Sequence, residues 1–246
     1  MRLAGRVIAL ALVLFIALLL HGACRLVRLR SPAPRLFLAA VARIVGARPR
    51  TIGQPCRRNV MIVSNHLSWL DIPLLAGTTG AAFVAKAELD MVPLVGWLCR
   101  LNATIFVARD DRLAIGGQVD RLRAALAQRA AVAIFPEGTT GDGTTLLPFK
   151  ASLLAALDPP PPGVMVQPVR IDYGDATGEL AWVGDESGRH HAGRVLRRRG
   201  TFRPTLRFCA PFDPRDFPGR KAIAAEARRR IAMGAEAGGE PPRPAV

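Results

Sequence analysis

Acidic residues are absent from the first 70 positions of this 246-residue chain, whereas eleven arginines lie there. The whole chain has 34 Lys and Arg but only 19 Asp and Glu, which gives a net charge of +15. Such a balance favours an anionic partner: a nucleic acid, an anionic membrane surface or an acidic protein. Aromatic residues make up only 6% of the chain and no nucleic-acid-binding module is recognisable. We therefore expect no nucleic-acid partner and favour a membrane.

Cysteine is also scarce, and the four cysteines are scattered at Cys24, Cys56, Cys99 and Cys209. Their spacing fits neither a metal site nor a redox pair, so reduced thiols in the cytosol are the simplest interpretation. The chain also has no Gly-x-Ser-x-Gly nucleophile turn and no phosphate loop ending in Gly-Lys-Ser/Thr. We expect neither a metal ion nor a resident cofactor.

The one long apolar run lies near the N-terminus, where all fourteen residues from Val7 to Leu20 are apolar. A helix needs approximately 20 residues to span a bilayer. Three interpretations therefore remain open: a signal peptide, a marginal spanning helix, or a helix that dips into one leaflet. Arginines on both flanks disfavour translocation, and residues 34–45 show the pattern of a second helix at the membrane surface. We predict that residues 1–50 form a membrane-embedded helical hairpin.

The rest of the chain alternates between short apolar runs and helical patterns, which predicts an α/β sandwich with a largely parallel central sheet over residues 51–233. The arginine-rich stretch 189–207, which includes His190 and His191, is interpreted as a solvated basic surface facing lipid. Residues 234–246 are rich in Gly, Pro and Glu, and we predict that they are disordered. Strands are predicted at residues 59–64, 82–85, 104–107, 132–135, 164–171 and 205–209, and helices at residues 88–101, at residues 112–129 and from Lys150 to the prolines at 159–162.

A histidine follows the first of these strands directly. Ser68 then suits the N-cap of a helix, and Asp71 stands three residues later, where the acid of a capping box sits. His66 would thus lie on a strand-to-helix turn, where the Asp71 carboxylate can fold back to one imidazole nitrogen and leave the other free. A general base needs this orientation. The alternative is that Ser68 and Asp71 only cap the helix.

A second polar block, Phe135-Pro136-Glu137-Gly138-Thr139, follows the strand at 132–135. Asn65-His66-x4-Asp71 followed by this block resembles the glycerolipid acyltransferase family, which includes the 1-acylglycerol-3-phosphate acyltransferases. Further blocks are similar in order and spacing: Gly96, Ile105 to Arg109, and Val166-Gln167-Pro168-Val169. The resemblance covers roughly residues 55–215, and the two motifs together are specific.

This resemblance implies that His66 is the catalytic base and that Asp71 orients and stabilises its imidazolium. The hydroxyl of a membrane lysolipid would attack a thioester directly, without an acyl-enzyme, and the acyl donor would be acyl carrier protein or acyl-CoA. The implied acceptor is 1-acylglycerol-3-phosphate, giving phosphatidate. We expect a bacterial-type inner membrane location with the catalytic domain in the cytoplasm.

The resemblance also suggests the substrate-binding residues, among them Asn65, Thr139 and Pro168. Gly138 would permit a close backbone approach to an anion. Glu137 is expected to accept a hydrogen bond from a glycerol hydroxyl or to pair with Arg109 or Lys86. Arg109 suits a phosphate or carboxylate fork, and the alternative for it is an ion pair with Asp110 or Asp111.

One position departs from the family pattern. Many lysophosphatidate acyltransferases carry Arg directly after Glu-Gly-Thr, whereas this chain has Thr140. The change removes a charge-assisted hydrogen bond to phosphate, worth roughly 1.5 to 3 kcal/mol. A lyso-ornithine lipid is therefore an alternative acceptor. A noncatalytic basic module that binds membranes is the rival from a different class.

Overall fold

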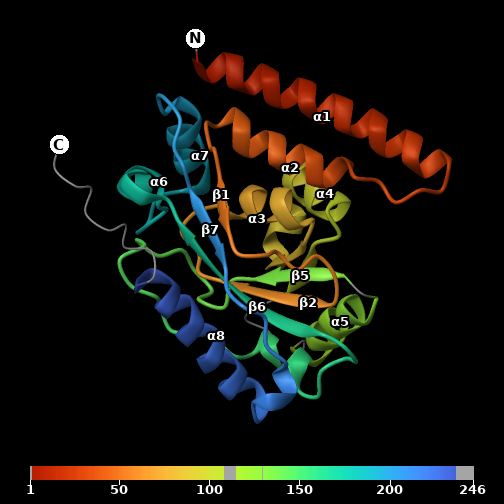
Figure 1. Cartoon of the computed structure of the whole chain (residues 1–246). Coiled ribbons are helices and arrows are strands. Elements are labelled where there is room, and N and C mark those ends of the chain that lie inside the picture. The colour runs from red at the N-terminus through yellow and green to blue at the C-terminus, as the bar shows by residue number, and fades with distance from the viewer. Residues whose placement is uncertain (1, 108–114, 129, 237–246) are drawn as a thin grey trace.

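The computed structural model describes residues 2–107, 115–128 and 130–236 (Figure 1). Within them a seven-stranded sheet has the order β1-β7-β6-β2-β5-β3-β4. All neighbouring pairs are parallel except β6 and β7. The predicted α/β fold and largely parallel sheet are thus confirmed. The strands are β1 (Arg50–Ile52), β2 (Val60–Ser64), β3 (Ala82–Lys86), β4 (Ile105–Val107), β5 (Ala131–Ile134), β6 (Met165–Asp172) and β7 (Thr205–Phe208).

Strand β2 lies at the centre of the sheet and is buried along its whole length. Val60 and Ile62 pack into the core on one face, and Met61 and Val63 pack into the core on the other. Side chains alternate between the two faces of a strand. A central parallel strand covered on both faces therefore needs the continuous apolar run that the sequence shows.

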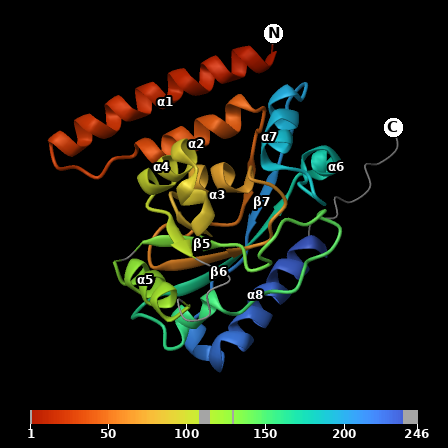
Figure 2. The ribbon, with the colours of Figure 1, turned by 180° about the vertical axis from the view of Figure 1, so that it is seen from behind.

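Helices cover both faces of the sheet (Figures 1 and 2). The core on one face is shared with α2 (Ala33–Ile44), α3 (Asp71–Thr79), α6 (Thr177–Leu180) and α7 (Gly188–Arg197). The core on the other face is shared with α5 (Ile115–Ala127) and α8 (Gly219–Glu236). The remaining helices are α1 (Arg2–Leu26), α4 (Pro93–Leu101) and the short 3-10 helices η1 (Ala87–Met91), η2 (Leu153–Leu157), η3 (Gly174–Ala176) and η4 (Pro214–Asp216).

Several element predictions need correction. The helix expected from Lys150 is only the 3-10 helix η2, and β1, α7 and α8 were not predicted. Helix α8 continues through Glu236, so residues 234–236 are helical rather than part of a disordered tail; residues 237–246 lie outside the described residues. The core contacts of α8 end at Ile231, and its last turns lie against β7, since a Cβ placed on Gly234 would be 3.1 Å from the Arg207 Cδ.

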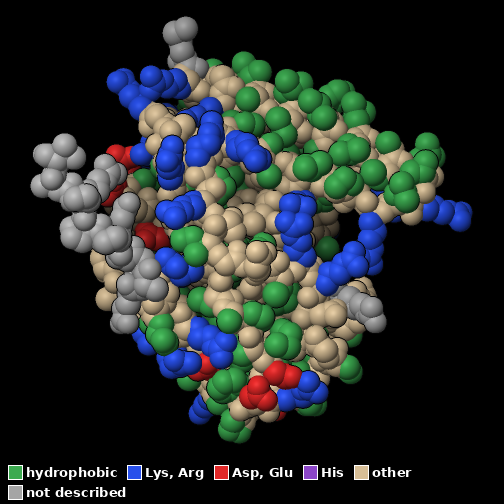
Figure 3. Space-filling model, in the orientation of Figure 1, with side chains coloured by type: hydrophobic (Ala, Val, Ile, Leu, Met, Phe, Trp, Pro, Cys, Tyr) green, Lys and Arg blue, Asp and Glu red, His purple; other side chains and the backbone are tan. Residues whose placement is uncertain are grey.

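Helix α1 is long and apolar enough to cross a membrane, with a mean hydropathy of 2.7 over 18 residues. It packs against α2 along one side, where half-buried residues such as Leu10, Leu14 and Leu18 recur every four residues. The opposite side of α1 is an exposed apolar strip, visible across the upper part of Figure 3. The larger residues of this strip are Val7, Ile8, Leu12, Phe15, Ile16, Leu19 and Leu20.

The N-terminal hairpin is bound to the rest of the domain. The Arg6 guanidinium donates to the backbone oxygens of Val195 (3.2 Å), Leu196 (3.0 Å) and Arg198 (3.0 Å). These carbonyls belong to the last turn of α7 and to its C-cap residue, where a helix leaves backbone oxygens without helical partners. Helices α2 and α3 also pack closely, because a Cβ placed on Gly77 of α3 would lie only 2.8 Å from the Ala39 Cα of α2.

Candidate active site

The residues of both motifs follow adjacent parallel strands. His66 comes after β2, Phe135 to Glu137 come after β5, and Tyr173 comes after β6. Because β5 and β6 flank β2 in the sheet, the carboxyl ends of all three strands meet at one edge. In open α/β sheets, ligands bind at this edge, where the connections diverge.

The two residues of the first motif are hydrogen bonded. His66 Nδ1 lies 2.8 Å from Asp71 Oδ2, and the Asp71 side chain is fully buried while that of His66 is 19% exposed. A carboxylate oxygen accepts, so Nδ1 carries the proton and the lone pair of Nε2 is left to accept a proton. This tautomer is the one that a general base needs.

Asp71 also shapes the turn that carries His66. Its Oδ2 accepts from the backbone amides of Leu67 (2.6 Å) and Ser68 (3.0 Å). The helix begins at Asp71 itself, so Ser68 is not its N-cap as the sequence had suggested. The Ser68 hydroxyl is instead bonded to the amide of Leu70 (3.3 Å) and to His191 Nε2 (2.9 Å).

Tyr173 completes the surroundings of Asp71 and was not predicted from the sequence. Its buried hydroxyl donates to Asp71 Oδ1. Burial raises the pKa of Tyr173 well above its ordinary value, and the charge of Asp71 adds to this effect, so the phenol remains a donor. The available signals were that it is the only tyrosine in the chain and that it follows a predicted strand.

The second motif positions the imidazole. The Phe135 ring stacks on the His66 ring with centroids 4.0 Å apart and an interplanar angle of 9°. Phe83 in turn stacks on Phe135 at 5.6 Å. The His66 ring is therefore held in its plane by Phe135 and along its Nδ1 edge by Asp71.

Glu137 joins the two motifs through the backbone. Its Oε2 accepts from the His66 amide at 3.2 Å. Burial raises its pKa to about 7, against the opposing effect of the amides of His66 and Leu147. Arg109, one of its predicted partners, lies outside the described residues, and no ion pair joins Glu137 to Lys86 within the described part of the chain.

A cation lies beside the Glu-Gly-Thr turn. Gly138 has a φ of +76°, and a Cβ placed on it would lie 3.0 Å from the Lys150 Nζ. The Lys150 amide also donates to the Pro136 carbonyl at 2.8 Å. Sequence reasoning missed Lys150, which lies beyond the motif and carries no local signal. Thr139, next to Gly138, is exposed.

The other predicted binding residues are at different places. The Asn65 amide is buried and bonded at both ends to the backbone of Ile171, at 2.9 and 2.8 Å. Pro168 is buried within β6 opposite Val63, and Lys86 is exposed at the end of β3. The Thr140 hydroxyl donates to the Trp182 carbonyl, which ties the second motif to the segment before α7.

Comparison with known proteins identifies the family. The family model for acyltransferases matches residues 47–172. A lyso-ornithine lipid O-acyltransferase from Rhodobacter capsulatus is 37% identical, over 95% of this chain and 90% of the relative. A 1-acyl-sn-glycerol-3-phosphate acyltransferase from Neisseria gonorrhoeae is 35% identical, over 52% of this chain and 51% of the relative.

A solved structure is similar over nearly the whole chain. It is that of the 1-acyl-sn-glycerophosphate (LPA) acyltransferase, PlsC, from Thermotoga maritima, with a TM-score of 0.63 and 26% identity, covering 96% of this chain and 97% of that one. The chain belongs to the acyltransferase family. It is an enzyme that acylates lysolipids, so the resemblance inferred from the sequence is confirmed and the interpretation as a noncatalytic module is set aside.

Proposed function

We propose that His66 Nε2 takes the proton from the acceptor hydroxyl as that oxygen attacks the carbonyl carbon of an acyl thioester. The observation that carries this is the 2.8 Å bond from His66 Nδ1 to the buried Asp71 carboxylate. That carboxylate stabilises the imidazolium formed during attack. The new C–O bond forms, the C–S bond breaks, and the departing sulfur takes the proton back from His66.

Replacing His66 by Ala tests the role of the base. We expect loss of acyl transfer in membranes that contain the variant, with unchanged amounts of folded protein. Asp71→Asn should also lower the rate strongly, because Asn offers a donor where the turn needs an acceptor. The proposal fails if His66→Ala retains the activity of the parent.

For the acceptor, we propose a lyso-ornithine lipid, with 1-acylglycerol-3-phosphate as the second candidate. Support comes from the extent of the likeness to the Rhodobacter protein and from Thr140. The Thr140 hydroxyl is bonded to the Trp182 carbonyl, so this position holds no cation for a phosphomonoester. Lys150 supplies one positive charge near Gly138, which suits the single carboxylate of an ornithine headgroup.

Direct competition between the two lysolipids tests this choice. We expect the parent enzyme to prefer lyso-ornithine lipid and Thr140→Arg to move the preference toward lysophosphatidate. Thr140→Val is the matched control, because it removes the bond to Trp182 without adding a charge. A parent that prefers lysophosphatidate by orders of magnitude, together with no effect of Thr140→Arg, would refute the assignment.

The acyl donor is proposed to be acyl carrier protein or acyl-CoA, both of which are anionic. Support comes from a surface hollow beside α6 and α7 whose charged residues are mainly basic. The hollow is lined by Gly178, Glu179, His190, Arg194, Arg197, Arg198 and Arg199. Activity measured with purified acyl carrier protein and with purified acyl-CoA as the donor distinguishes the two candidates.

We further propose that α1 lies in one leaflet of a bacterial inner membrane with the catalytic domain on the cytoplasmic side. The exposed apolar strip of α1 would face lipid, while Arg6 holds the other side of the helix against α7. Met91 and Leu94, in η1 and α4, add exposed apolar side chains of 84% and 59%. A helix packed along its own domain in this way suits a dip into the bilayer better than a crossing.

A further inference from the structure

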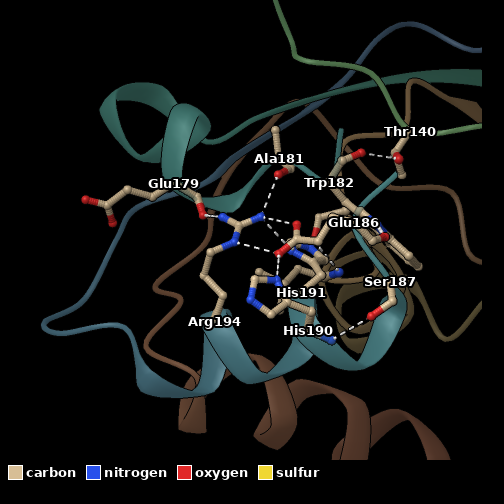
Figure 4. A network of polar contacts seen from close by, with 11 residues as sticks. Thr140, Glu179, Ala181, Trp182, Glu186, Ser187, His190, His191 and Arg194 are labelled. Carbon is tan, nitrogen blue, oxygen red and sulfur yellow. Dashed lines mark hydrogen bonds and ion pairs between the residues drawn. The ribbon is translucent and has the colours of Figure 1, made fainter. Parts of the chain in front are cut away.

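A second polar network lies behind Asp71 and involves α7. His191 was expected on a solvated surface, but its side chain is fully buried, whereas that of the adjacent His190 is 76% exposed. The two histidines point in different directions because successive side chains on a helix are about 100° apart. Figure 4 shows His191 among Trp182, Glu186 and Arg194.

The hydrogen bonds of His191 have a fixed direction. Arg194 Nη2 lies 2.9 Å from His191 Nδ1, and a guanidinium can only donate. Nδ1 is therefore the acceptor, and Nε2 carries the proton and donates to the Ser68 hydroxyl at 2.9 Å. Glu186 lies 3.4 Å from Nδ1 but pairs more closely with Arg194, at 2.6 Å.

Burial, together with the charge of Arg194, disfavours the protonated form of His191. Burial lowers its pKa, and the positive charge of Arg194 lowers it further, against the opposing effects of Glu186 and Asp71. His190 acts in the same direction as Arg194. The Trp182 ring stacks on His191 with centroids 5.2 Å apart and fixes the plane of the imidazole.

The series of hydrogen bonds continues from Ser68 to the Asp71 carboxylate in the catalytic turn. The Ser68 oxygen accepts from His191 Nε2 and from the Leu70 amide, and the Ser68 amide donates to Asp71 Oδ2 at 3.0 Å. Tyr173 reaches the same carboxylate at its other oxygen, because its hydroxyl donates to Asp71 Oδ1.

We propose that Arg194, His191, Ser68 and Tyr173 form a positioning relay that fixes the Asp71 carboxylate and, through it, the catalytic orientation of His66. Arg194 donates to His191 and His191 donates to Ser68, whose amide donates to Asp71 Oδ2. Tyr173 donates to Asp71 Oδ1, and His66 Nδ1 and the Leu67 amide donate to Oδ2. A carboxylate that accepts four hydrogen bonds cannot rotate without breaking some of them. The relay rests on the role proposed above for His66.

A purely structural network would have different consequences. It would hold α7 against the catalytic turn, and its loss would lower stability without changing the turnover of the molecules that remain folded. A relay that acts on Asp71 changes kcat at constant KM, because substrate binding does not depend on the orientation of the imidazole. Its members also depend on one another, so their effects are not additive.

The experiment uses the full-length enzyme with four variants: Tyr173→Phe, His191→Ala, the double variant and His191→Gln. Each single loss should lower kcat about 10- to 100-fold with KM unchanged, because a hydrogen bond to a charged centre is lost. The double variant should be no slower than the slower single variant. His191→Gln keeps both a donor and an acceptor and should recover most of the rate.

Asp185→Ala is the matched control, because Asp185 is exposed in the segment directly before α7 and does not line the basic hollow. It should leave kcat unchanged. Unchanged kcat in Tyr173→Phe, or losses that multiply in the double variant, would overturn the relay. Tyr173→Phe removes a single oxygen and decides the matter if His191→Ala does not fold. His66→Ala in the same assay separates the two proposals: an active His66→Ala refutes the base, whereas an inactive His66→Ala beside a fully active Tyr173→Phe refutes only the relay.

Discussion

Glu137 gives the protein a pH-dependent stability that one substitution should remove. The carboxyl group is buried, and burial raises its pKa from 4.5 to about 7. Between these values the folded protein binds a proton that the unfolded chain has released. The free energy of unfolding therefore falls as pH rises from 4.5 to about 7 and levels off above that.

The size of this effect follows from the pKa difference. A difference of about 2.5, at about 1.36 kcal/mol for each pKa unit, corresponds to up to about 3 kcal/mol. Glu137→Gln keeps an oxygen that can accept from the His66 amide but carries no charge. Relative to the parent, this variant should gain that free energy between pH 4.5 and pH 7.5, or about 6 to 12 °C in Tm for a chain of this size.

Thermal unfolding of the full-length protein in detergent, followed by circular dichroism from pH 4.5 to pH 8, measures this gain. Glu226→Gln is the control, because Arg229 and Arg230 lower the pKa of Glu226 to about 2 and neither partner titrates in the range. The difference in Tm between parent and Glu226→Gln should then be constant from pH 5.5 to pH 8. A constant difference for Glu137→Gln as well would refute the buried, proton-binding carboxyl group.

Three further predictions concern the turn, the hairpin and the membrane. Gly138→Ala should cost about 1–2 kcal/mol of stability, because the residue has a left-handed backbone, and should lower acyl transfer because its Cβ displaces the Lys150 ammonium; an unchanged Tm and rate would contradict this. Arg6→Gln should lower Tm and expose α1 to protease by removing three bonds to α7, whereas Gln at the exposed Arg2 should do neither. In sealed inner-membrane vesicles with the cytoplasmic face outward, added protease should digest the catalytic domain; full protection would place the domain on the other side.

The sequence alone determined the layered α/β fold and the two motifs. Buried strands need apolar runs, and these are visible locally, as from Val60 to Val63. The His66 and Asp71 pair is only five residues apart, so a turn was enough to predict their contact. The arginine-rich segments concealed α7 and α8, because their apolar positions are few and are recognisable only against the core that they cover.

The tertiary structure decided which residues surround the catalytic pair. Tyr173 and Asp71 are 102 residues apart, and Ser68 and His191 are 123 residues apart, so no local pattern connects them. They meet because β6 is the spatial neighbour of β2 and because α7 packs over the same face of the sheet. Pairing between distant strands is set by burial across the whole domain. A local motif can therefore predict the role of His66 but not the distant side chains that orient it.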